Sequence, residues 1–133
     1  MSGVSNLETA RRYIASLASS AGLEDLEEFL GRDFVQEEFP NRFFPRGSTS
    51  DLQQTKEARA RGQALLKAES FEAVGAVASA DEVALEVKWT GTVSEASGPF
   101  TAGQVLRARF AIFLEFNEGR ITKQRNYDCF ESW

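Results

Sequence analysis

The chain has 133 residues, of which 42% are hydrophobic and 26% are charged, the composition of one globular domain. Its net charge of -5 argues against nucleic-acid partners and against an anionic membrane surface. The absence of histidine and the single cysteine, Cys129, exclude an internal disulfide, a thiolate metal cage and histidine-based triads. There is no apolar run of bilayer length and no apolar signal core at the start, so we expect a single cytoplasmic domain over 1–133.

The chain begins with two predicted helices. A capping-box pattern at Ser5–Glu8 precedes apolar residues that recur every three or four positions over 7–21, and Gly22 follows. This spacing predicts an amphipathic helix that ends at the glycine. A short second helix is predicted over 23–30, with Gly31 as its C-cap.

An extended piece and a loop are predicted next. Residues 33–39 have an extended pattern, and 40–50 form an aromatic loop with two prolines. A third helix is predicted over 51–67 behind a cap pattern at Ser50–Gln53. Its apolar face is thin, so we expect it to lie at the surface.

The second half of the chain predicts strands. Apolar and polar residues alternate, with turn residues at 94–99 and 117–119, so that strands are predicted over 71–79, 83–93, 105–116 and 120–130. Successive hairpins predict an antiparallel sheet with one face on a core. Helices gathered before the strands predict an α+β fold.

Several segments of the chain resemble a known family. R-Y-I at 12–14 and D-F-V-Q-E-E-F-P at 33–40 resemble the start of ketosteroid isomerases. V-x-W-T-G-T at 87–92 and E-G-R-I-T-K-Q-R-N-Y-D at 118–128 resemble SnoaL-like polyketide cyclases. The chain is thus similar, over nearly its whole length, to these branches of the nuclear transport factor 2-like superfamily. The resemblance implies a conical pocket between helices and a curved sheet, and a homodimer through the outer sheet face.

The ketosteroid isomerase pattern implies roles for three positions. Tyr13 stands where that family has a tyrosine that donates to an oxyanion, and Glu38 stands at the position of its carboxylate base. Ile112 occupies the position of the second oxyanion donor, so this chain departs from the pattern there. The alternatives are a core tyrosine with a satisfied hydroxyl group and a solvated glutamate beside Glu37.

The last predicted strand carries a polar line. Periodicity leaves open which of its faces is inward, and the resemblance implies that the even positions are, among them Gln124, Asn126 and Asp128. SnoaL-like cyclases are thought to use an aspartate late in the chain as acid or base, and Asp128 is the nearest match. The alternative is that Asp128 pairs with an arginine and has only a structural role.

The remaining candidate ligand-binding residues are apolar. The resemblance implies that Trp89 faces the pocket, and Phe110 and Ile112 share one face of the 105–116 strand. Phe39 belongs to an aromatic group that either covers the pocket or anchors the loop. Together these residues favour a small hydrophobic ligand.

Three other features have ordinary structural interpretations. The charged residues of the opposite strand faces, such as Glu86 and Arg109, are expected to form cross-strand ion pairs or a dimer interface. The arginines in or after the aromatic loop, Arg42, Arg46, Arg59 and Arg61, either meet an anionic ligand or are solvated. Cys129 is expected to be a small buried hydrophobe.

These observations lead to two functional hypotheses. In the first, Asp128 or Glu38 moves a proton beside a carbonyl group while Tyr13 or an amide donates to the oxyanion, without metal or organic cofactor. Isomerase, cyclase or dehydratase chemistry all fit this hypothesis. In the second, the chain is a non-catalytic ligand-binding or dimeric interaction module. An inward carboxyl group poised near neutral pH favours an enzyme, whereas one locked to Arg125 favours the second hypothesis.

Overall fold

The structure, a computed structural model, describes residues 3–18 and 25–133. The helices of these residues are α1 (Gly3–Leu17), α2 (Asp25–Phe29) and α3 (Leu52–Leu65). Their strands are β1 (Leu30–Glu38), β2 (Ser48–Asp51), β3 (Leu66–Ala78), β4 (Glu82–Val93), β5 (Val105–Asn117) and β6 (Arg120–Phe130). The predicted α+β fold is confirmed: the helices pack on a curved sheet that does not close.

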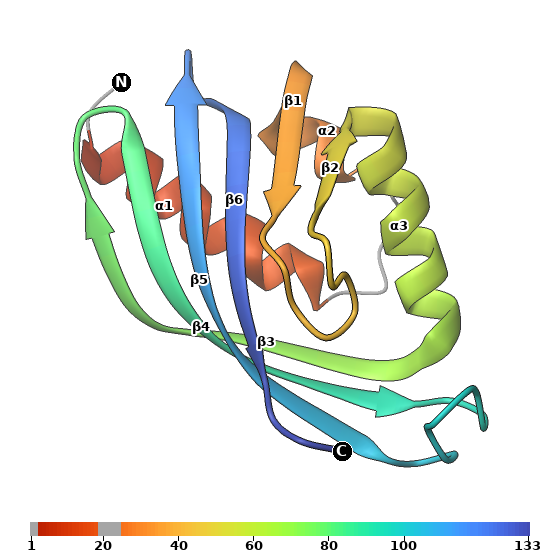
Figure 1. Cartoon of the computed structure of the whole chain (residues 1–133). Coiled ribbons are helices and arrows are strands. Elements are labelled where there is room, and N and C mark those ends of the chain that lie inside the picture. The colour runs from red at the N-terminus through yellow and green to blue at the C-terminus, as the bar shows by residue number, and fades with distance from the viewer. Residues whose placement is uncertain (1–2, 19–24) are drawn as a thin grey trace.

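The sheet has the strand order β2-β1-β6-β5-β4-β3. Strands β3 to β6 pair antiparallel with their sequence neighbours, as the predicted hairpins require. Strand β1 pairs parallel with β6, a contact that the hairpin pattern does not contain. Figure 1 shows α1 running across the strands and α3 standing beside β2, while β3, β4 and β5 bend strongly along their length.

The core lies on the concave face of the sheet and follows the alternation of the sequence. In β4 and β5 every second residue is buried, including Leu85, Val87, Ile112 and Leu114. These side chains pack against the apolar stripe of α1, of which Ile14 is fully buried. The face that the sequence predicted to be inward is therefore the inward face.

Several predicted boundaries are wrong. Helix α1 begins at Gly3, so Ser5 lies inside it and does not cap it. The predicted stop at Gly22 lies outside the described residues. Gly31 belongs to β1 and is not a helix cap. The polar segment Ser48–Asp51 pairs with β1 as a short edge strand, although its first three residues were predicted as loop and Asp51 as the start of the third helix.

Helix α3 is capped one residue later than the sequence pattern predicted. The Asp51 carboxylate accepts a hydrogen bond from the Gln54 backbone at 2.8 Å, and the Gln54 side chain accepts one from the Asp51 backbone at 3.0 Å. This capping box satisfies donors at the first turn. The helix passes directly into β3 at Leu66, five residues before the predicted start of that strand.

The outer face of the sheet is charged and partly aromatic. Arg109 and Glu86 form the predicted cross-strand ion pair at 2.5 Å. Cys129 also lies on this face and is exposed, so its prediction as a buried hydrophobe is wrong. It sits at an odd position of β6, whereas the even positions from 124 to 130 line the cavity.

No helix of the described residues is long and apolar enough to cross a membrane.

Candidate functional site

A cavity of about 430 Å³ lies between the concave face of the sheet, α1, α3 and the loop after β1. Such a volume lies within the range of small-molecule sites. Most of its lining is apolar and includes Leu17, Leu26, Phe43, Phe44, Leu65, Leu66, Phe71, Trp89, Leu106, Phe110, Ile112 and Phe130. Polar side chains line two parts of the wall.

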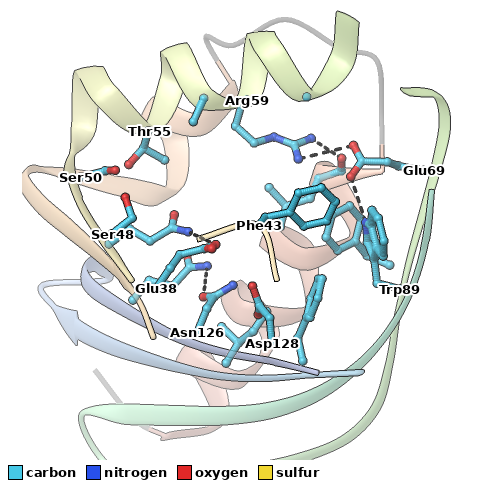
Figure 2. Close-up of a pocket in the computed structure, with 18 of the residues that line it drawn as sticks. Glu38, Phe43, Ser48, Ser50, Thr55, Arg59, Glu69, Trp89, Asn126 and Asp128 are labelled. Carbon is cyan, nitrogen blue, oxygen red and sulfur yellow. Dashed lines mark hydrogen bonds and ion pairs between the residues drawn. The ribbon is translucent and has the colours of Figure 1, made fainter. Parts of the chain in front are cut away.

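The parallel pairing of β1 with β6 brings the first polar group together. Gln36 lies beside Gln124 in the register, and Glu38 lies beside Asn126. Because side chains alternate along a strand, all four point to the same face, and so does Asp128 two residues farther along β6. Glu38, Asn126 and Asp128 approach one another at one wall of the cavity, as Figure 2 shows. Glu37 points to the opposite face, as its place next to Glu38 predicted.

The two carboxyl groups share one environment. Burial raises the pKa of Glu38, and hydrogen bonds from Asn41 and Gln36 partly offset this rise; the Gln36 amide lies 3.2 Å from Glu38 Oε1. Burial and the charge of Glu38 raise the pKa of Asp128 to about 7, with a hydrogen bond from Asn126 acting in the opposite direction. Two carboxyl groups so close together do not ionise independently. Burial and the Glu38 charge therefore favour the protonated form of Asp128 up to about pH 7.

No arginine of the described residues pairs with Asp128. Arg125, the alternative partner, lies on the outer face, 2.5 Å from Glu115 and 3.5 Å from Glu82. One Asp128 oxygen, Oδ1, is buried without a hydrogen-bond partner. A buried unpaired oxygen has a high free-energy cost, and functional sites are where such costs are found. The described residues contain no cluster of three or more metal-ligating side chains.

A chain of buried hydrogen bonds orients the amides beside the carboxyl groups. The Tyr13 hydroxyl donates to Gln124 Oε1 at 2.6 Å, and Gln124 Nε2 donates to Asn126 Oδ1 at 2.8 Å. Since the Asn126 oxygen is occupied, its amide nitrogen is the group that faces Asp128. Burial raises the pKa of Tyr13, so its hydroxyl group stays protonated and remains a donor. Tyr13 thus anchors the amide chain, and its proton is directed to Gln124.

The predicted ligand-binding residues line the cavity in the structure, with the exception of Phe39. Trp89, Phe110 and Ile112 line the cavity, as do Gln124 and Asn126. Phe39 does not line it. Because Glu38 faces inward, the next residue faces outward, and the Phe39 ring stacks on Tyr127 with 4.3 Å between ring centroids. Two other aromatic residues of the same loop, Phe43 and Phe44, line the cavity instead.

The sequence did not predict several polar residues of the cavity. Gln36 lies two residues before Glu38 in β1, so both side chains point to the same face. This spacing could have identified it. Ser48, Ser50 and Thr55 also line the cavity, and the two serines were hidden because β2 was predicted as loop. Glu69 also lines it, as do Arg59 and Arg61 of the four arginines with open roles. Arg42 instead stacks over Trp133 at 4.2 Å.

Comparison with known proteins identifies the family. The model of the SnoaL-like domain matches residues 10–124. The chain belongs to the SnoaL-like domain family. No curated protein sequence matches this SnoaL-like protein significantly.

Solved structures share its fold. AclR from Streptomyces galilaeus, a candidate hydroxylase, has a TM-score of 0.81 and 16% identity, covering 98% of this chain and 82% of AclR. IdmH from Streptomyces antibioticus, a candidate polyketide cyclase, has a TM-score of 0.79 and 20% identity, covering 92% and 91% of the two chains. A protein with a ketosteroid isomerase-like fold from Catenulispora acidiphila, in complex with trimethylamine, has a TM-score of 0.70 and 19% identity, covering 90% and 84%. At these identities the similarity establishes the fold alone.

Proposed function

We propose that this SnoaL-like protein is a cofactor-independent acid–base enzyme that acts on a small hydrophobic carbonyl compound. The observation that carries the proposal is the placement of Glu38 and Asp128 together in an apolar cavity, where burial raises the pKa of both groups, that of Asp128 to about 7. A base and an acid with pKa values close to the working pH are what proton transfer next to a carbonyl group needs. The absence of an arginine at Asp128 in the described residues favours this hypothesis over a structural role.

Glu38 and Asp128 have different roles in the proposed reaction. The ionised Glu38 takes a proton from the carbon next to the carbonyl group, and the electron pair of that C–H bond forms an enolate. The protonated Asp128, with the Asn126 amide beside it, donates to the enolate oxygen as its charge develops. Return of the proton from Glu38 to the far carbon of a conjugated dienolate gives isomerisation. Attack of the enolate carbon on a second carbonyl group gives cyclisation, and the proton that Glu38 took goes to the new alkoxide oxygen. Transfer of that proton to a β-hydroxyl group lets it leave as water while the carbonyl group re-forms, which gives dehydration.

The neighbouring structures support this chemistry by analogy. IdmH is named as a candidate polyketide cyclase, and an enolate that attacks a second carbonyl is cyclase chemistry. Ile112 lines the cavity of this chain, where the ketosteroid isomerase pattern has a second oxyanion donor. Asn126 and the protonated Asp128 take the place of that donor in our proposal.

The first test measures proton transfer without knowledge of the final product. Hydrophobic ketones such as 2-tetralone are incubated with the protein in D₂O, and exchange of the protons next to the carbonyl group is followed by NMR. We expect catalysed exchange with the wild-type protein and a loss of about 100-fold or more in Asp128→Asn and Glu38→Gln, because each removes one partner of the acid–base pair. Cys129→Ser, on the outer face, is the matched control and should keep full activity.

One observation favours the non-catalytic alternative. The only proton of the Tyr13 hydroxyl is directed to Gln124, so it is not available to a substrate oxyanion in this arrangement. Ketones that bind to the wild-type protein without exchange, or exchange that is equal in all three variants, would contradict the enzyme hypothesis. A small-molecule-binding module would then be the better account.

We also propose that the protein forms a homodimer through the outer sheet face. Tyr127 and Val105 are exposed there, and Phe39 and Phe113 pack around Tyr127. Exposed aromatic and aliphatic side chains on one sheet face are typical of protein interfaces. Light scattering should give twice the chain mass of 14.7 kDa, and Tyr127→Glu should shift it toward one chain. A wild-type monomer at high protein concentration contradicts this arrangement.

A further inference from the structure

The cavity has a second polar group, which the proposed acid–base chemistry does not use. Arg59 of α3, Glu69 of β3 and Trp89 of β4 form it, and all three line the cavity. Figure 2 shows them on the other side of the cavity from Glu38 and Asp128, with the guanidinium and carboxylate groups facing each other. Apolar side chains, among them Phe71, line the wall around them.

The contacts within this group fix its orientation. The Trp89 indole donates to Glu69 Oε2 at 2.9 Å, and Arg59 Nη2 donates to the Leu17 backbone oxygen at 2.5 Å. Leu17 is the last residue of α1, whose terminal carbonyl groups favour a cation. Arg59 also lies over the Phe71 ring, 5.8 Å from its centroid. The group is therefore held by α1, α3, β3 and β4 together.

The hydrogen-bonding capacity of the group is not used up by these contacts. Arg59 Nη1 lies 3.5 Å from Glu69 Oε1, close enough for an ion pair but at the long limit for a hydrogen bond. A guanidinium group carries five N–H donors and a carboxylate has about four acceptor sites. The side chains are only 20% and 12% exposed, so bulk water has little access to them. An arginine and a glutamate with spare donors and acceptors, side by side in a ligand-sized cavity, form a recognition site.

We propose that Arg59 and Glu69 bind a hydroxyl group at the end of the ligand that lies away from Glu38 and Asp128. A hydroxyl group accepts one hydrogen bond and donates another, so it can accept from Arg59 and donate to Glu69 at once. This inference rests on the proposed function, which assigns the ligand's carbonyl group to the carboxyl pair. It defines the ligand class as a hydrophobic carbonyl compound with a hydroxyl group at its far end.

The charges of the cavity favour a hydroxyl group over a carboxylate. Glu69 neutralises Arg59, and Glu38 contributes the negative charge that raises the pKa of Asp128. The other arginine of the lining, Arg61, has an exposed side chain and is screened by water. A ligand carboxylate at Arg59 would therefore meet Glu69 without a compensating buried cation, and its desolvation would oppose binding.

The test compares ligands that differ by one group. The first pair is 2-acetonaphthone with 6-hydroxy-2-acetonaphthone, and the second, longer pair is 4-acetylbiphenyl with its 4'-hydroxy derivative. Dissociation constants are measured by calorimetry, and the Trp89 indole N–H signal is followed by NMR. We expect the hydroxylated member of at least one pair to bind about tenfold or more tightly, as charge-assisted hydrogen bonds allow. The carboxylated analogue, 6-acetyl-2-naphthoic acid, should bind more weakly than the hydroxylated ketone.

Variants decide whether this preference comes from the proposed group. Arg59→Met should reduce the hydroxyl preference to about twofold or less while the affinity for the unsubstituted ketone stays similar. Glu69→Gln keeps an acceptor for Trp89 and should reduce the preference in part, so the test does not depend on one variant's folding. Arg11→Met is the control, because Arg11 is exposed on α1 and does not line the cavity, and it should behave as wild type.

The remaining outcomes overturn the inference. A hydroxyl preference that survives in Arg59→Met, equal affinities within both ligand pairs, or no binding of any ligand would each contradict it. The failure of the proposed function is separate, since affinities are measured without turnover. Hydroxyl-selective binding through Arg59 with no proton exchange at the ketone would keep this site and reject the enzyme.

Discussion

At the scale of single residues, the proposed role of Asp128 comes with a cost in stability. Burial and the neighbouring Glu38 charge raise its pKa from 3.8 to about 7 in the folded protein. The unfolded chain therefore loses this proton near pH 4, while the folded chain keeps it to about pH 7. The folded state binds more protons over this interval, so its stability falls as the pH rises through it, and the full cost is present above pH 7.

Replacement of this residue should therefore stabilise the protein at high pH. Asparagine keeps the shape of a protonated aspartate but cannot ionise. We expect Asp128→Asn to raise the free energy of unfolding by about 2–4 kcal/mol near pH 8.5, with little gain near pH 4. Urea denaturation at both pH values measures the difference. A gain that is equal at the two pH values, or absent at both, would contradict the assigned pKa.

The alternation of side chains along each strand explains which cavity residues could be predicted from the sequence and which could not. Gln124, Asn126 and Asp128 share a face with Phe130, and the structure has all of them in the cavity lining. Phe39 and Cys129 were misplaced although each follows an inward residue. Their types, aromatic and small apolar, suggested burial, but alternation within β1 and β6 turned both outward. Residue type was the weaker guide at these two positions.

At the scale of elements, the junction of β1 with β6 determines the site. From the sequence, Glu38 and Asp128 were alternative candidates for the base, and they lie far apart in the chain. Their proximity comes from a parallel strand pair, which leaves no mark in local hydrophobic patterns. Edge strand β2 was missed for a related reason, since its polar residues S-T-S at 48–50 resemble a loop. The pairing of strands that are distant in the chain could not be predicted from local sequence patterns.

The β4 strand contains a glycine that the cavity wall requires. A Cβ atom at Gly91 would lie 2.6 Å from the Trp89 ring and 3.0 Å from Leu66 Cδ1. We expect Gly91→Ala to displace the indole ring from Glu69, to lower stability by about 1–3 kcal/mol and to weaken ketone binding. Thermal unfolding and calorimetry measure the two effects.

Gly75, in the neighbouring strand β3, is the matched control. A Cβ atom there has no neighbour within 4 Å, and alanine is favoured over glycine inside a strand by about 0.5–1 kcal/mol. Gly75→Ala should therefore be neutral or slightly stabilising and should bind ketones as wild type does. Equal behaviour of the two variants would show that the Trp89 ring is not constrained at Gly91.

At the scale of the whole molecule, the order of elements was the most predictable feature. Helices before long alternating strands specified the α+β fold, and the period of two showed which residues of β4 and β5 share a face. The cavity depends on the bend of the sheet and on the placement of α3, which are properties of the assembled chain. The group of Arg59 with Glu69 joins α3 to β3 and is therefore visible only in three dimensions.

The central claim is that Glu38 and Asp128 share one proton near neutral pH, and a direct titration tests it. Carboxyl carbons are labelled with ¹³C, and the Asp128 signal is followed against pH in the wild-type protein and in Glu38→Gln. We expect Asp128 to titrate at about pH 7 in the wild type and at a clearly lower pH in the variant, because the neighbouring charge is gone. An Asp128 signal that titrates near pH 4 in the wild-type protein, or one that does not respond to the loss of Glu38, would contradict the account.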